Sequence, residues 1–274
     1  MPVARYAEHP YFAEHRDRPL LMAHRGGAGL WPENTMYAFE RAIDLGVDVL
    51  ETEIRSTSDR VLVLIHDNTL DRTTNGTGPI GGISLRELKA LDAGFNWSTD
   101  GGRTSPFRGR GIKVPTLEEL FIAFPNVRVN IDVKQIEPSL IAPLCKTIRS
   151  FGMADQVMVA SFEFKVLEVF RRVCPEVATS LSRREVEMFY LMNLVFLGKA
   201  FRTAAYALQV PEYYGRLRVL TKRLVETAHS LNLKVHAWTI NETSDMRRLL
   251  DLGVDGIITD YPDRLLPLLE RDQQ

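Results

Sequence analysis

The sequence predicts an α/β fold of the (β/α)8 TIM-barrel type, with an insertion in the loop after the second strand. Short apolar, β-branched segments alternate with helical patterns along most of the 274 residues, as expected for βα units around a parallel sheet. The segments LGVDVLETE (45–53) and LGVDGIITD (252–260) repeat one helix-to-strand connection, in which a glycine ends the helix. Reactive side chains follow several strands, where barrel enzymes place their active sites.

Nine segments have the composition of strands: residues 20–24, 48–53, 61–65, 127–133, 156–161, 177–180, 206–210, 234–239 and 256–259. Eight strands close a barrel, so one segment must lie outside it. Residues 55–60 are too few for a parallel crossover, which needs a dozen or more residues. We therefore predict that 61–65 folds back antiparallel on the second strand, leaving eight parallel strands.

Helical patterns cover residues 35–45, 117–124, 139–151, 163–173, 183–197, 221–231, 244–252 and 263–270. Residues 67–115 differ, because they are rich in Gly, Thr, Arg and Pro and only 85–91 has a helical pattern. We expect 67–115 to be an insertion within a single domain of residues 1–274. A disordered linker is the alternative, but Phe95, Trp97 and Phe107 favour packing.

The composition argues against nucleic acid as a partner and indicates a cellular location. With 45% hydrophobic residues and a net charge of -1, the chain lacks the broad basic field that nucleic-acid binding needs. Cys145 and Cys174 have a spacing that suits neither a zinc site nor a disulfide framework, so we expect buried thiols in a reducing, cytoplasmic location. Residues 1–19 carry both charge signs and no apolar core, unlike a signal peptide.

The reactive groups are spaced so that they converge. Residues 51 and 53 share one face of their strand, as do residues 130, 132 and 134, because strand side chains alternate. The strand ends supply His24, Arg25, Glu51, Glu53, His66, Asp132, Lys134 and Trp238.

Three inward carboxylates, Glu51, Glu53 and Asp132, would repel one another unless a cation lay between them. Oxygen ligands favour magnesium or calcium over zinc. The sequence therefore predicts one divalent cation, Mg²⁺ or Ca²⁺, on these three residues. Structural ion pairs with Arg25 and Lys134 are the alternative.

Several motifs together resemble the glycerophosphodiester phosphodiesterase family, in order from Leu21 to about Pro262: HRGGAGLWPENT, ETEIRSTSDRVLVLIHDNTLDRTTNGTG, PTLEEL, VNIDVK, SF at 161–162, HAWTIN and GVDGIITDYP. The resemblance implies that His24 and His66 are the acid–base pair and that the carboxylates bind one divalent ion. Arg25 and Lys134 correspond to groups near the phosphate. Two positions depart from the family pattern, since Glu53 stands where Asp is usual and Asp132 where Glu is usual.

The resemblance implies a metal-dependent hydrolase that cleaves small glycerophosphodiesters to glycerol 3-phosphate and an alcohol. Trp238 is then either a contact for glycerol or a core residue, and Asp67 either orients His66 or caps a turn. A lysophospholipase D activity on single-chain lipids and a non-catalytic binding barrel are the alternatives. The sequence does not predict the alcohol or the oligomeric state.

The apolar segment 189–197, FYLMNLVFL, bears on the lipid alternative. It is much shorter than the ~20 residues of a membrane span, so we predict no transmembrane segment, and peripheral lipid contact stays open. A lysolipid substrate requires this region to face the barrel mouth. We expect it to pack on the barrel wall instead, because every barrel helix must bury one face. The residues concerned are Met188, Phe189, Met192, Phe196 and Leu197.

Overall fold

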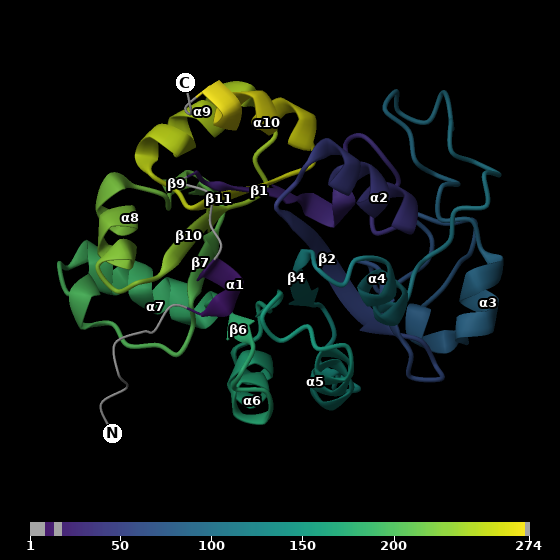
Figure 1. The fold of residues 1–274 in the computed structure, drawn as a ribbon, viewed down its shortest axis with the longest axis horizontal. Coiled ribbons are helices and arrows are strands. Elements are labelled where there is room, and N and C mark those ends of the chain that lie inside the picture. Colours follow the sequence, from purple (N-terminus) through teal and green to yellow (C-terminus); the bar gives the residue numbers. More distant parts are fainter. Residues whose placement is uncertain (1–8, 14–17, 272–274) are drawn as a thin grey trace.

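The first strand of the barrel, β1 (Leu20–Ala23), lies between the second strand and the last. It pairs in parallel with β2 (Val49–Ser56) on one side and with β11 (Gly256–Thr259) on the other, so early and late segments of the chain meet (Figure 1). The computed structural model describes residues 9–13 and 18–271. Most of the segment predicted not to be a signal peptide lies outside the described residues.

Eight parallel strands form a nearly closed ring in the described part of the chain. Their order is β6 (Ala178–Thr179), β5 (Val157–Ala160), β4 (Arg128–Val133), β2, β1, β11, β10 (Lys234–Ala237) and β7 (Ala207–Val210). A parallel bridge between Ser180 and Ala207 joins the two ends of this order. The predicted TIM-barrel class is therefore confirmed.

The ninth segment folds back as predicted. Strand β3 (Leu62–Leu64) pairs antiparallel with the far end of β2, with Ile54 opposite Leu64 and Ser56 opposite Leu62. This pairing returns the chain to the carboxyl end of β2, so the residues that follow β3 lie at the mouth of the barrel.

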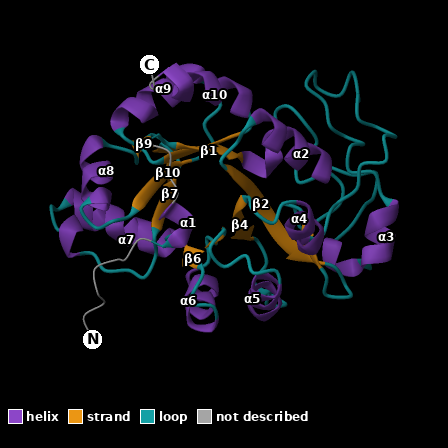
Figure 2. Ribbon diagram, in the orientation of Figure 1, coloured by secondary structure: helices purple, strands orange, loops and turns teal. Residues whose placement is uncertain are grey.

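Helices surround the ring on its outer side (Figure 2). Four of them begin at Thr35, Thr116, Ser182 and Thr221, whose hydroxyls accept a hydrogen bond from a backbone N–H in the first turn, as N-cap residues do. The helices between and after the barrel strands are α2 (Met36–Leu45), α4 (Leu117–Ala123), α5 (Ile141–Ser150), α6 (Phe164–Val173), α7 (Arg183–Leu194), α8 (Lys222–His229), α9 (Thr243–Leu252) and α10 (Pro262–Arg271).

Helix α7 is shorter than predicted. It ends at Leu194, and a separate turn, η3 (Gly198–Ala200), follows. Phe196 adopts a left-handed backbone conformation with φ 64°, which stops the helix although the apolar pattern continues. Within the described residues, no helix has the length and apolar character needed to cross a membrane.

Two short elements lie outside the repeating units. Helix α1 (Pro10–Ala13), which we did not predict, buries Tyr11 and Phe12 against Met158, Ala178 and Ala207. These partners lie at or near the amino ends of their strands, so α1 covers the end of the barrel opposite the site. Strands β8 (Tyr213–Tyr214) and β9 (Leu217–Arg218) form a hairpin in the loop after β7.

Residues 67–115 contain η2 (Ile80–Gly82) and α3 (Leu85–Ala90), and otherwise irregular structure. Leu70, Ile80, Leu88 and Phe107 form a buried cluster with β3. The indole N–H of Trp97 donates a hydrogen bond of 3.0 Å to the carbonyl of Ala28. This segment therefore packs on the barrel.

The prediction of free cysteines is wrong. Cys145 in α5 and Cys174 after α6 form a disulfide, with Cα atoms 5.9 Å apart. The pairing depends on the side-by-side packing of two neighbouring helices, which the spacing of 29 residues does not reveal. Because disulfides are rare in reducing compartments, the cysteines no longer support a cytoplasmic location, which stays a prediction.

Candidate active site

His24 and Arg25 lie in a tight turn, η1 (His24–Gly26), directly after β1. Arg25 has a left-handed backbone with φ 52°, followed by Gly26 at 81° and Gly27 at 97°. A Cβ atom on Gly26 would lie 2.9 Å from the ring of Phe39, so only glycine fits there. The turn keeps both reactive side chains at the carboxyl end of the strand.

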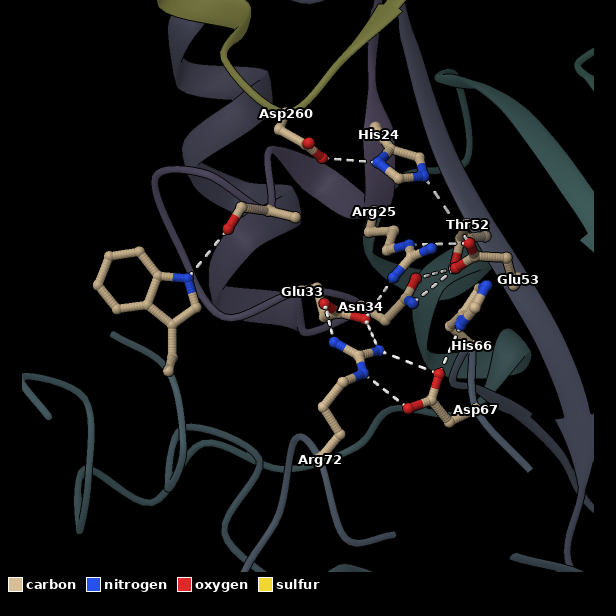
Figure 3. A network of polar contacts seen from close by, with 12 residues as sticks. His24, Arg25, Glu33, Asn34, Thr52, Glu53, His66, Asp67, Arg72 and Asp260 are labelled. Carbon is tan, nitrogen blue, oxygen red and sulfur yellow. Dashed lines mark hydrogen bonds and ion pairs between the residues drawn. The ribbon is translucent and has the colours of Figure 1, made fainter. Parts of the chain in front are cut away.

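The imidazole of His24 is held on both sides by carboxylates (Figure 3). Its Nδ1 lies 2.6 Å from Oδ1 of Asp260, directly after β11. Its Nε2 lies 4.0 Å from Glu51 Oε2 and 3.9 Å from Glu53 Oε1. The contact with Asp260 fixes the ring and directs Nε2 towards the acidic pair.

Our sequence reasoning did not identify Asp260 as a site residue, although a signal was present. The repeated segments LGVDVLETE and LGVDGIITD end in Glu53 and Asp260, at equivalent positions. Glu53 lies within β2, and Asp260 lies directly after β11.

His66 has a similar arrangement in the loop after β3. Its Nδ1 lies 2.5 Å from Oδ1 of Asp67, so the contact that orients His66 is present. Arg72 donates from Nε to Asp67 Oδ2 at 2.6 Å. The hydrogen bond from Arg72 and that from His66 lower the pKa of Asp67 to about 2, despite partial burial. Asp67 is therefore a carboxylate at neutral pH.

A chain of ion pairs connects the two histidine turns, as Figure 3 shows. Arg72 makes two hydrogen bonds of 2.7 Å to the carboxylate of Glu33. Glu33 accepts from Arg25 Nη1 at 2.9 Å, and Arg25 Nε donates to Glu53 at 2.9 Å. Glu33 and Arg72, which sequence reasoning also missed, thus connect the 67–115 segment to the acidic pair.

The predicted metal ligands lie side by side on β2 and β4. Glu51 and Glu53 are buried on one face of β2, and one ligand atom from each lies within 4.8 Å of the others and of His24. Asp132 is opposite Glu53 in the strand register. Its Oδ2 lies 2.7 Å from Lys134 Nζ, whereas its buried Oδ1 has no hydrogen-bond partner among the described residues. That unpartnered oxygen and the buried pair fit a hard divalent cation.

The pKa values of these carboxyl groups are also consistent with a cation-binding site. Burial, and next the neighbouring Glu53, raises the pKa of Glu51 to about 8. Burial also raises the pKa of Asp132, against the opposing charge of Lys134. Burial therefore disfavours negative charge on both carboxyl groups, whereas a bound cation would favour it.

The surrounding charges also act on His24. Burial lowers the pKa of its imidazole, but Glu51, the hydrogen bond to Asp260 and then Glu53 raise it above the usual value. This ring is therefore suited to hold a proton near neutral pH.

A cavity of about 540 Å³ opens at the carboxyl ends of the strands. Another part of the lining comes from Val186 and Tyr190 of α7 and Leu217 of the hairpin, together with Arg183 and Glu187 of α7. The ring of Trp238 packs edge-on to Phe162, with centroids 5.9 Å apart. The cavity brings together all of the predicted site residues: His24, Arg25, Glu51, Glu53, His66, Asp132, Lys134 and Trp238.

The five α7-region residues that bear on a lipid substrate do not line this cavity. Phe189 is buried against Phe201, with ring centroids 5.1 Å apart, and Met192 packs on the main core. Met188, Phe196 and Leu197 are exposed. The prediction that this segment packs on the barrel wall is therefore confirmed for Phe189 and Met192 and is wrong for the other three residues.

Comparison with known proteins agrees with the site. Residues 24–264 match the model of the glycerophosphoryl diester phosphodiesterase family. The chain belongs to this family. A glycerophosphodiester phosphodiesterase from Caldanaerobacter subterraneus subsp. tengcongensis is 34% identical over 260 residues, which cover 93% of this chain and 99% of that protein. Lysophospholipase D from Homo sapiens is 26% identical and covers 90% of this chain and 85% of its own.

Solved structures of glycerophosphodiester phosphodiesterases share the barrel. One from Agrobacterium tumefaciens has a TM-score of 0.71 at 27% identity and covers 90% of this chain and 98% of its own. A phosphodiesterase from Oleispira antarctica, in complex with the product sn-glycerol-3-phosphate, has a TM-score of 0.76 at 26% identity, covering 92% and 97%. The predicted enzyme class is therefore confirmed, and the non-catalytic alternative is set aside.

Proposed function

We propose that this chain hydrolyses glycerophosphodiesters to glycerol 3-phosphate and an alcohol, with one bound divalent cation and two histidines as acid and base. One observation carries the proposal. His24 and His66 line the same cavity as the buried Glu51–Glu53 pair, and each histidine has its Nδ1 against a carboxylate. The Oleispira antarctica structure with sn-glycerol-3-phosphate supports the choice of product.

The histidines supply proton transfer. An Nδ1 held by Asp260 or Asp67 leaves Nε2 of each ring for the substrate. One imidazole accepts the proton of the attacking oxygen, and the other donates a proton to the leaving alkoxide, a division of roles that suits imidazole near neutral pH. Either histidine can take either role.

Glu51, Glu53 and Asp132 are the residues that would hold Mg²⁺ or Ca²⁺. When bound, such an ion supplies Lewis-acid charge that neutralises a phosphoryl oxygen. Lys134 lines the cavity beside Asp132 and provides a second positive charge for the phosphate. Arg25 is engaged by Glu33 and Glu53, so we assign it to positioning the carboxylates as well as to binding anions.

The apolar end of the cavity favours a second candidate, a lysophospholipase D activity. Val186, Tyr190 and Trp238 contribute apolar surface to the lining, and an acyl chain needs an apolar surface. The relative from Homo sapiens with that name supports the candidate. Glycerol-based, water-soluble diesters remain our first choice, because α7 adds the charged side chains of Arg183 and Glu187 to the lining beside Val186 and Tyr190.

A substrate panel tests the proposal. We expect turnover of glycerophosphocholine and glycerophosphoethanolamine that is lost with chelator and restored by Mg²⁺ or Ca²⁺. Lysophosphatidylcholine at the same concentrations measures the second candidate. A kcat/KM for the lysolipid that exceeds those of both soluble diesters would reverse our ranking, and no turnover of any of them would reject the proposal.

A further inference from the structure

Exposed apolar side chains gather at the end of α7. Thirteen large hydrophobic residues are exposed in the described chain, and six of them lie between Met188 and Leu197. Single exposed apolar residues are ordinary, whereas a contiguous group marks an interaction surface. We call the following residues the α7 tip: Leu191, Leu194, Val195, Phe196 and Leu197, with exposed fractions of 61, 47, 63, 80 and 58%.

Phe196 at the centre of the α7 tip is conformationally strained. It has φ 64°, in the left-handed region that bulky residues rarely adopt. Phe196 N–H donates to the carbonyl of Asn193, and Leu197 N–H to that of Met192, so Phe196 occupies the helix-ending position that usually takes glycine. A phenylalanine with a strained backbone and a side chain that is 80% exposed contributes little to the stability of the fold. Backbone strain of this kind often accompanies function.

The α7 tip is connected to the cavity wall through α7 itself and contacts the first turn of α8. The guanidinium of Arg223 lies 4.5 Å from the centroid of the Phe196 ring, and Arg223 is in the first turn of α8, which follows the loop after β7. Along α7, Val186 and Tyr190 line the cavity. Leu194 follows Tyr190 by four residues, and therefore one turn on the same face.

The segment that contains the α7 tip has a net positive charge. Residues 183–226, from the start of α7 into α8, contain eight Lys or Arg residues and four Glu residues, in a chain whose net charge is -1. Glu212 is buried and is paired with Arg248 and with Arg218, and Lys222 is paired with Glu226. The exposed positive charges that follow the α7 tip in the chain come from Lys199, Arg202 and Arg216.

We propose that the α7 tip is a docking surface for an anionic lipid bilayer. Phe196 and its apolar neighbours enter the boundary between headgroups and acyl chains, and the flanking lysines and arginines bind the negative headgroups, a pattern typical of interfacial attachment. Since no described helix can cross a membrane, the contact is peripheral. The inference does not depend on the proposed hydrolysis, because none of the α7-tip residues lines the cavity.

Co-sedimentation of the full chain with vesicles tests this inference. We compare vesicles of phosphatidylcholine alone with vesicles that also contain phosphatidylglycerol, at low and high salt. The wild-type chain should bind the anionic vesicles more tightly, and high salt should weaken that binding. Binding to neither composition, or equal binding to both, contradicts the proposal.

Phe196→Asn is the informative variant, because asparagine tolerates a left-handed backbone. We expect about a tenfold loss of affinity for anionic vesicles, with an unchanged or higher Tm and unchanged turnover of soluble glycerophosphocholine. Ile122→Asn is the matched control, since Ile122 is 67% exposed on α4. The double variant Lys199→Gln/Arg216→Gln should bind anionic vesicles more weakly, by about fivefold for each charge removed.

A dimer interface is the competing explanation for the α7 tip. If size-exclusion chromatography with light scattering shows a dimer that Phe196→Asn dissociates, and vesicles do not bind, the tip is a contact between copies and the proposal is wrong. Equal vesicle binding by Phe196→Asn and Ile122→Asn also overturns it. Neither result affects the hydrolase proposal, whose readout is turnover of a soluble diester.

Discussion

Asp260 Oδ1 lies 2.6 Å from Nδ1 of His24, although the two residues are 236 positions apart in the chain. The parallel pairing of the first and last strands, β1 and β11, brings them together. Asp260 in turn accepts a hydrogen bond of 2.7 Å from Asn241. The closure of the barrel therefore fixes the orientation of the imidazole.

Asp260→Asn should reduce kcat by about 10- to 100-fold with a smaller effect on KM, because the histidine loses its orienting carboxylate. Since the contact with Asp260 raises the pKa of His24, the variant should also shift the histidine-dependent limb of the pH–rate profile to lower pH. A profile that stays unchanged would show that Asp260 has only a structural role.

His24→Ala and His66→Ala should each lower kcat by about 10²–10⁴, the usual contribution of a general acid or base. Their circular dichroism and Tm should stay close to wild type, because both side chains lie at the barrel mouth. His229→Ala is the control, since His229 pairs with Asp255 outside the cavity. Near-wild-type kcat in either cavity variant rejects that assignment.

Arg72→Gln tests whether the 67–115 segment supports catalysis. The hydrogen bond from Arg72 is the main cause of the low pKa of Asp67, so the variant should raise that pKa and loosen His66. We expect a fall in kcat without a matching rise in KM. Arg41→Gln, which removes an exposed ion pair with Asp44, should leave both constants unchanged. A pure KM effect would instead place Arg72 in substrate binding.

In the presence of chelator, the free energy of unfolding should depend on pH, because Glu51 titrates with a different pKa in the folded and unfolded states. Burial and Glu53 raise its pKa from 4.5 to about 8 in the ion-free protein, so the folded state binds more protons than the unfolded state between these values. The stabilisation is complete below about pH 4.5 and is lost as the pH rises towards 8. Added Mg²⁺ or Ca²⁺ should offset this loss.

Thermal unfolding from pH 5 to 8.5, with chelator and with added ion, measures this dependence. Glu51→Gln is the matched variant, because it keeps the shape but does not titrate. It should flatten the pH dependence in chelator and remove much of the stabilisation by the ion. An ion effect that is independent of pH and of Glu51 contradicts the proposed ligand set.

The composition of short segments predicted the strands of the barrel, and the lengths of the connections between them predicted how the strands pair. Residues 55–60 are too short for a crossover, so the antiparallel return of β3 could be inferred from length alone. Because side chains alternate along a strand, the spacing of two residues predicted that Glu51 and Glu53 lie on the same face. The eight predicted site residues line one cavity because barrel strands end together.

What the sequence did not predict depends on contacts between distant segments. Asp260, Glu33 and Arg72 lie on loops, and their roles follow from how those loops meet. The Cys145–Cys174 disulfide similarly reflects the packing of α5 on α6. The division into one domain with an insertion at 67–115 stays a prediction, as do the catalytic and metal-binding roles.

The products of glycerophosphocholine, identified by phosphorus NMR, test the central claim most directly. The wild-type chain with Mg²⁺ or Ca²⁺ should release glycerol 3-phosphate and choline, and the chelated chain should release neither. Cleavage on the other side of phosphorus gives phosphocholine and glycerol. Phosphocholine as the product, or glycerol 3-phosphate formed at the same rate by His24→Ala and His66→Ala, would contradict the account.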